Sequence, residues 1–324
     1  MRDNIKQIIT SIAVLGLCGC QHAQQMKPAR MHEYATSIRE EMHKHPNFSQ
    51  EKYKAAIDRK YDSLFKKSKP AMPGYSDDAL KQTFVMYDTL SFYTLGSRYL
   101  TGMEDAFTEL KERNLEKTNC DINYSKGSCV EDMFSAYVNQ GNLLSAKRIQ
   151  GEYPKILPDE QVPETREPAE YLEKARNLYN VSADGKRFDL EPVDISTRPV
   201  MVAIMATDCH FSRRILKNLL TDSGLKRDFE KYGLIIMPLN TSLSFIPEVV
   251  RWNTENPKLP FRIHSDRADL RAGWEKLNFT SIPQFYFMRN GEVVDYIGGW
   301  GPNDEEFTVR LRQGLDKLKI EQNK

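Results

Sequence analysis

The C-terminal half of the chain alternates short apolar runs with amphipathic stretches. Unbroken apolar runs of strand length predict buried strands at 200–206 and 234–239, and residues 261–264 predict a short strand. Apolar residues at helical spacing predict helices at 211–222, 244–254, 268–277 and 304–319. Strands joined in this way by helices indicate a small α/β domain with a mixed sheet, which we place at residues 178–320.

Turn residues predict a hairpin at each end of this domain. Asn290–Gly291 separates the extended runs 284–289 and 292–297, and this residue pair is the one that two-residue hairpin turns favour. Asp184–Gly185 lies between two shorter extended runs, just before the first buried strand. The sheet is therefore expected to begin and end with antiparallel pairs.

The N-terminal half shows helical spacing instead. Residues 31–69, interrupted by Pro46, predict two helices, and 79–114 predicts two more with Gly102 between them. A spacing like that of a tetratricopeptide repeat is formed by Tyr137, Gly141, Ala146 and Pro158. This spacing leaves open whether the hairpins are true repeats or part of a generic all-α domain, which we place at residues 31–155.

Two polar segments predict connections between these units. Residues 20–30 lack apolar periodicity and predict a tether. Residues 156–177 are rich in Pro and Glu and predict a linker with a short helix, whose pattern runs from 169 to 179.

Residues 1–19 have the pattern of a signal peptide. A charged start precedes an apolar stretch at 8–17, which is too short to span a bilayer, since spanning takes roughly 20 residues. The sequence Leu-Cys-Gly-Cys that ends at Cys20 resembles a bacterial lipobox, which implies cleavage before Cys20 and attachment of lipid such as palmitate. Cleavage by an ordinary signal peptidase is the alternative. Gln21 favours the outer membrane, so we expect a lipoprotein of the bacterial cell envelope that is anchored to the membrane and faces the periplasm.

Composition narrows the function classes. The 324 residues include 46 Lys and Arg against 45 Asp and Glu, and a net charge of +1 lacks the strong basic field of nucleic-acid binding. The six histidines do not cluster, and no phosphate-binding glycine loop occurs. We therefore expect no cofactor, no metal and no nucleic-acid partner.

Export makes the remaining cysteines informative, because secreted compartments are oxidising. Cys120 and Cys129 flank a short polar loop, and we favour a structural disulfide bond between them. A second redox site, or two buried thiols, stay open as alternatives. An odd number of cysteines then leaves Cys209 free.

Cys209 follows a predicted buried strand and begins a predicted helix. The helix macrodipole and unpaired N–H groups stabilise negative charge on a sulfur at this place, and Arg213 and Arg214 act in the same direction. Asp208 opposes them, so the balance stays open. Ser212 stands where a Cys-x-x-Cys motif has its second cysteine, so the motif cannot close a disulfide.

Three motifs in order make residues 178–320 resemble the thioredoxin fold, in particular its TlpA-like branch. They are the hairpin at Asp184–Gly185, the turn at Cys209, and the loop 280–283 before the final hairpin. The resemblance implies a cis Ile282–Pro283 bond opposite Cys209, with the backbone of Ile282 presented to a substrate chain; a trans proline is the alternative.

Other positions depart from the pattern of this family. Ala203 stands where thioredoxins keep a buried Asp for proton transfer, and Met205 and Asp208 stand where they have tryptophans. These departures leave open whether the cysteine is active or vestigial.

The resemblance implies a set of site residues. The expected catalytic residues are Cys209, Ser212 and Pro283, and the expected substrate-binding residues are Ile282, His210 and Trp300. Trp300 alternatively packs the domain. The function we expect is thiol–disulfide exchange in the envelope, by monothiol reduction or isomerisation of protein substrates that carry thiols or disulfides. The alternative is a redox-inactive, protein-binding module.

Overall fold

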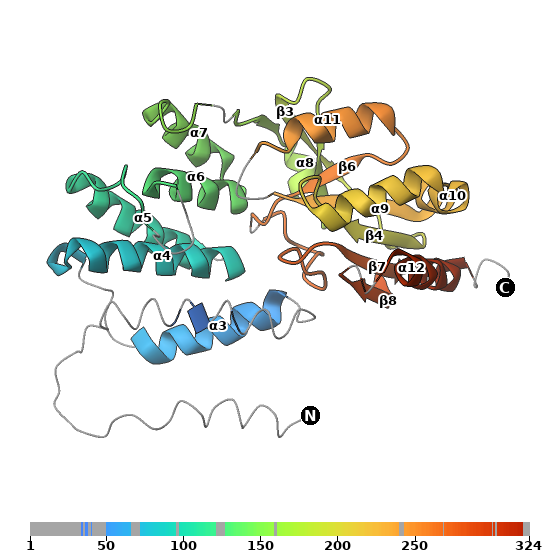
Figure 1. The fold of residues 1–324 in the computed structure, drawn as a ribbon, viewed down its shortest axis with the longest axis horizontal. Coiled ribbons are helices and arrows are strands. Elements are labelled where there is room, and N and C mark those ends of the chain that lie inside the picture. The colour runs from blue at the N-terminus through green and yellow to red at the C-terminus, as the bar shows by residue number, and fades with distance from the viewer. Residues whose placement is uncertain are drawn as a thin grey trace.

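A computed structural model of the chain describes residues 34, 36–37, 40, 50–65, 72–94, 97–120, 127–158, 161–239, 243–267, 269–299, 301 and 303–319 (Figure 1). The predicted signal peptide, Cys20, the tether at 20–30, Pro46 and Trp300 lie outside these residues. The helices of the N-terminal half and the sheet of the C-terminal half lie side by side (Figure 1).

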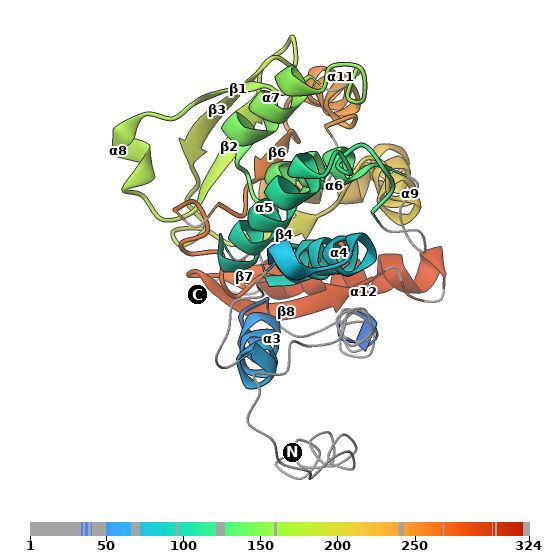
Figure 2. The same ribbon diagram turned by 90° about the vertical axis from the view of Figure 1, so that its left-hand side faces the viewer.

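The described part of the N-terminal half consists mainly of helices. They are α3 (Gln50–Phe65), η1 (Met72–Gly74), α4 (Asp77–Thr94), α5 (Ser97–Glu112), α6 (Cys129–Asn139) and α7 (Leu143–Glu152). The helix α4 packs along α5, and α6 packs along α7, so these four helices form two hairpins (Figure 2). The helical character of this half agrees with the sequence pattern, and the likeness to tetratricopeptide repeats stays a prediction.

Two glycines shape these hairpins in different ways. The predicted break at Gly102 is wrong, because Gly102 lies inside α5. A Cβ there would lie 2.5 Å from the ring of Tyr87, so the glycine lets α5 approach α4 closely. Gly141 does lie at the turn between α6 and α7, with a φ of +69° that suits glycine.

The C-terminal half is built on one mixed sheet. Its strands are β1 (Glu164–Arg166), β2 (Asn177–Val181), β3 (Arg187–Pro192), β4 (Val200–Ile204), β5 (Gly233–Pro238), β6 (Phe261–His264), β7 (Gln284–Arg289) and β8 (Glu292–Gly298). They lie in the order β1-β3-β2-β6-β5-β4-β7-β8, with β4, β5 and β6 parallel and the two predicted hairpins antiparallel. Both central residues of the Asn290–Gly291 turn have positive φ, as this turn type requires.

Five helices of the described residues accompany the sheet. They are α8 (Ala169–Leu172), α9 (His210–Thr221), α10 (Ser223–Tyr232), α11 (Ile246–Glu255) and α12 (Asp304–Lys319). Successive residues of β4 are buried on opposite faces: Met201 and Ala203 join the hydrophobic cluster of the helices, while Val202 and Ile204 join a second cluster around Trp274. Burial of both faces explains why the sequence of β4 is continuously apolar.

The helix predicted at 268–277 is wrong. The described residues of this segment form turns, and Gly273 has a φ of +84°. Leu270, Trp274 and Leu277 are nevertheless buried, and their spacing is the one that a helix also produces. The turns carry Trp274 and Leu277 onto the second face of the sheet.

Three further elements differ from the sequence pattern. The helix predicted at 169–179 is limited to α8, because Tyr179 belongs to β2. The segment predicted as a linker, 156–177, contributes β1, which pairs in parallel with β3. The helix α10 was not predicted; Asp222 starts it by accepting hydrogen bonds from the backbone N–H groups of Gly224 and Leu225.

The helical half and the sheet half share one hydrophobic cluster, which includes buried residues of both. One close approach between them is at Gly141, where an added Cβ would lie 1.9 Å from Oγ of Ser265, in the loop after β6. Lys147 of α7 also pairs with Glu164 of β1, with 3.5 Å between Nζ and Oε1. The helical half therefore packs on the sheet at the end where β6 finishes.

Candidate functional site

Cys209 lies where the chain passes from β4 into α9. It is the N-cap residue of α9, with φ −74° and ψ 123°, and its thiol makes no capping hydrogen bond. The side chain is half-buried, and Cys209 is the free cysteine of the described residues. The buried strand and the helix that follows thus hold an accessible sulfur at a helix N-terminus.

The proline loop lies beside this turn. β4 and β7 pair antiparallel with Ile204 opposite Gln284, so the residues after β4 lie next to those before β7. The Ile282–Pro283 peptide bond is cis, as the resemblance implies. The side chains of Ile282 and Cys209 pack against the same hydrophobic cluster. The backbone N–H and C=O of Ile282 make no hydrogen bond to any described residue.

Ser212 is fully buried beneath this turn. Its Oγ accepts a hydrogen bond from the backbone N–H of Ala206 at 3.2 Å. Among the described residues no hydrogen bond joins Ser212 to Cys209. Ser212 thus supports the turn that carries the sulfur, and its catalytic role stays a prediction.

The surface beside the sulfur is partly aromatic and partly charged. His210 is exposed, and its ring meets that of Phe211 edge-on with 5.5 Å between centroids. Phe211 is 45% exposed, so its ring adds apolar surface next to the turn. Arg214 pairs with Asp304 of α12 at 2.7 Å, so part of its charge is neutralised away from Cys209.

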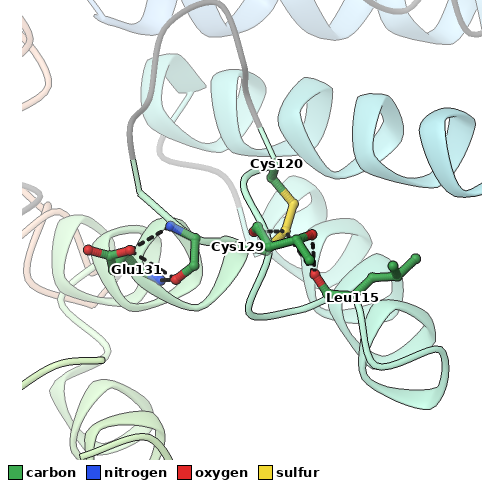
Figure 3. The surroundings of a disulfide bond; sticks show 6 residues. Leu115, Cys120, Cys129 and Glu131 are labelled. Carbon is green, nitrogen blue, oxygen red and sulfur yellow. Dashed lines mark hydrogen bonds between the residues drawn. A yellow bond between two sulfur atoms is a disulfide. The ribbon is translucent and has the colours of Figure 1, made fainter. Parts of the chain in front are cut away.

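The predicted disulfide between Cys120 and Cys129 is present (Figure 3). Both cysteines are buried, and Cys129 is the first residue of α6. Ser128 caps this helix, and Oε2 of Glu131 accepts a hydrogen bond from the backbone N–H of Ser128, which completes a capping box. The disulfide and the cap together fix the start of α6, which favours a structural role.

A small cavity of about 50 Å³ lies between the helical half and the proline loop. Phe92 near the end of α4 and Asn139 at the end of α6 line it from one side. Thr280 and Ile282 of the proline loop line it from the other, together with the buried carboxyl of Asp266. The C-terminal ends of two helices therefore lie against the loop that accompanies Cys209.

Sequence reasoning missed the residues that the helical half brings to this cavity. Asn139 is the last residue of α6 and Phe92 belongs to the last turn of α4, and neither stands in a motif. Asp266 follows β6 and accepts a hydrogen bond from Nε2 of the buried His264 at 3.2 Å. The only feature of the sequence that could have indicated Asp266 is its position two residues after a strand.

The described residues contain neither a candidate metal site nor a candidate membrane span. No group of three or more His, Cys, Asp or Glu side chains there is arranged to hold a metal ion. None of the helices in the described part of the chain combines the length and the apolar character that a bilayer crossing requires.

No protein-family model matches the chain, and neither does any curated protein. Among solved structures, a thioredoxin-like protein from Bacteroides caccae aligns with 11% identity and a TM-score of 0.27, over 96% of this chain and 99% of that one. The strand order, the cysteine at a strand-to-helix turn and the neighbouring cis proline are what fit an α/β domain of the thioredoxin-like class.

Proposed function

We propose that this protein exchanges disulfides with protein substrates through the thiol of Cys209. The observation that carries the proposal is the pairing of a half-exposed free sulfur at a helix N-terminus with the unpaired backbone of Ile282 beside it. An extended chain that hydrogen-bonds to Ile282 would bring its own sulfur toward Cys209.

The chemistry that this site supports uses one sulfur. The Cys209 thiolate attacks one sulfur of a substrate disulfide; a new bond joins the two sulfurs, and the other substrate sulfur leaves as a thiolate. Because Ser212 stands in the place of a resolving cysteine, release needs a second thiolate, from the same substrate or from a small thiol. A second thiolate of the substrate attacks the substrate sulfur, which returns Cys209 and isomerises the substrate disulfide. A small external thiolate instead attacks the Cys209 sulfur and releases the substrate as a dithiol. A second small thiolate then returns Cys209 and forms a disulfide with the first, which gives net reduction.

A protein-binding module without redox activity is the second candidate. It is favoured by the buried hydrogen bond of Ser212 and by the side chains of Ala203 and Met205, which are fully buried and apolar. The strand beneath Cys209 therefore offers no acid or base to a reaction.

We further propose that the protein works in the bacterial envelope as a lipoprotein anchored through Cys20. The signal pattern of residues 1–19 supports this location, and the oxidising compartment fits the disulfide between Cys120 and Cys129. Cells fed labelled palmitate should label the wild-type protein, and Cys20→Ala should lose the label. Equal labelling of both would contradict the anchor.

The rate of alkylation tests the redox proposal. Because exchange requires Cys209 to react as a thiolate, the proposal predicts that iodoacetamide at neutral pH modifies Cys209 faster in the folded protein than in the protein unfolded in urea. The variant Cys209→Ser, with its disulfide intact, shows the background. Slower alkylation of the folded protein would reject exchange chemistry and favour the binding module.

A further inference from the structure

The cavity beside the proline loop has an unusual polar wall. Asn139 lines it and is only 6% exposed, yet its side-chain amide makes no hydrogen bond to any described residue. Its polar atoms keep contact with solvent, so they are able to bind a polar group that enters the cavity. The neighbouring Gln140 differs: it is 7% exposed, and its Nε2 donates to the carbonyl of Ser91 at 2.7 Å.

Another residue that lines this cavity carries unpaired polar groups on its backbone. The backbone N–H and C=O of Ile282 lack partners among the described residues, and Ile282 lines the cavity together with Asn139. A side-chain amide and a backbone amide each offer one kind of donor and one kind of acceptor. Both therefore match the peptide groups of an extended chain.

We propose that Asn139 of the helical half is a positioning residue for the substrate of Cys209. Its amide hydrogen-bonds to a peptide group of the extended chain whose neighbouring residue pairs with Ile282. The inference rests on the proposed function and adds a partner surface to it: the substrate is a polypeptide held between the two halves of the molecule. The cavity of about 50 Å³ is large enough for a peptide group.

Two disulfide probes with the same leaving group separate this role from general reactivity. The first is a short extended peptide whose central cysteine is joined to 2-nitro-5-thiobenzoate; the second is the symmetrical disulfide of 2-nitro-5-thiobenzoate, which has no peptide. In each reaction Cys209 forms a bond to one sulfur of the probe, and the coloured thiolate leaves with the electron pair. Release of colour gives both rates.

We expect Asn139→Ala to slow the reaction with the peptide probe by about threefold to tenfold, the effect of one net hydrogen bond, and to leave the rate with the symmetrical probe unchanged. Asn139→Ser, which keeps a donor and an acceptor, should recover part of the rate. The matched control is Gln140→Ala, which loses a structural hydrogen bond at the same helix end and should leave both rates unchanged.

The outcomes distinguish this inference from the proposed function. An unchanged peptide rate in Asn139→Ala, equal slowing with both probes, or equal slowing in Gln140→Ala would overturn the role of Asn139 while leaving exchange at Cys209 intact. A wild-type protein that releases colour from neither probe would overturn the proposed function itself.

Discussion

Ser212 stands at a motif position in the sequence but makes a structural contact in the fold. Its position in the sequence suggests a partner for Cys209, but its Oγ accepts a hydrogen bond from the buried N–H of Ala206. The side chain thus replaces a missing backbone partner at the end of β4.

Ser212→Ala should therefore lower the free energy of unfolding by about 1 to 3 kcal/mol, because the N–H of Ala206 loses its acceptor in the core. The rate at which Cys209 reacts with a small aromatic disulfide should stay the same. Urea unfolding and colour release measure the two quantities. If the variant were as stable as the wild type but reacted more slowly, Ser212 would be a catalytic residue.

Local sequence revealed the residues whose roles depend on their immediate neighbours. Cys209 at a strand-to-helix turn and the pairing of Cys120 with Cys129 were predicted correctly. The state of the Pro283 bond was left open by the sequence, and the bond is cis, as the resemblance implies. Asn139 was missed because its importance comes from a loop 143 positions further along the chain at Ile282, and no local pattern records such a contact.

At the level of elements, the spacing of apolar residues predicted a helix correctly where the buried side chains lie on one face of a real helix. It failed at Leu270, Trp274 and Leu277, which have helical spacing but lie on turns, because a turn with a glycine at positive φ can bury the same set of side chains. It also missed β1, whose three residues are all exposed and carry no apolar signal.

The turn between α6 and α7 provides a test of element packing. Gly141→Ala should destabilise the protein by at least about 1 kcal/mol, because an L residue is strained at positive φ and the new Cβ meets Ser265. The control is Gly151→Ala in α7, where nothing lies within 4 Å; it should stabilise by up to about 1 kcal/mol through helix propensity. Two stability changes of the same sign would contradict this packing.

The disulfide provides a second test at this scale. Replacing Cys120 and Cys129 together by Ser should cost a little under about 3 kcal/mol in the chain-entropy model. Thermal unfolding with and without a reductant measures the loss, and the double variant should no longer respond to reductant. Because the bond is buried in the other half of the molecule, we expect the alkylation rate of Cys209 to be unaffected.

At the scale of the whole molecule, an ionic contact joins two segments that lie far apart in the sequence. Glu167, after β1, accepts hydrogen bonds from Arg267 and Tyr179. Burial alone would raise the pKa of Glu167, but these bonds outweigh it, and the pKa lies below its usual range. A carboxyl with a lowered folded-state pKa stabilises the fold at neutral pH, and this contribution is lost as the pH falls through the folded-state value.

Glu167→Gln should accordingly unfold at a lower temperature than the wild type at neutral pH, and the difference should shrink as the pH falls below about 4. Exposed Glu164, paired only with Lys147 at 3.5 Å, provides the control: Glu164→Gln should match the wild type throughout. Melting curves over this pH range decide the question. A difference that persists unchanged at low pH would show that Glu167 acts through packing alone.

For the molecule as a whole, we propose that other proteins form mixed disulfides with Cys209. The most direct test is to quench thiols in intact cells with acid, purify the protein without reductant, and identify its disulfide-linked partners by mass spectrometry. The wild type should carry partner proteins that a reductant releases, and Cys209→Ala should carry none. Equal recovery of the same partners by wild type and Cys209→Ala, without any disulfide link, would contradict exchange and show a binding module.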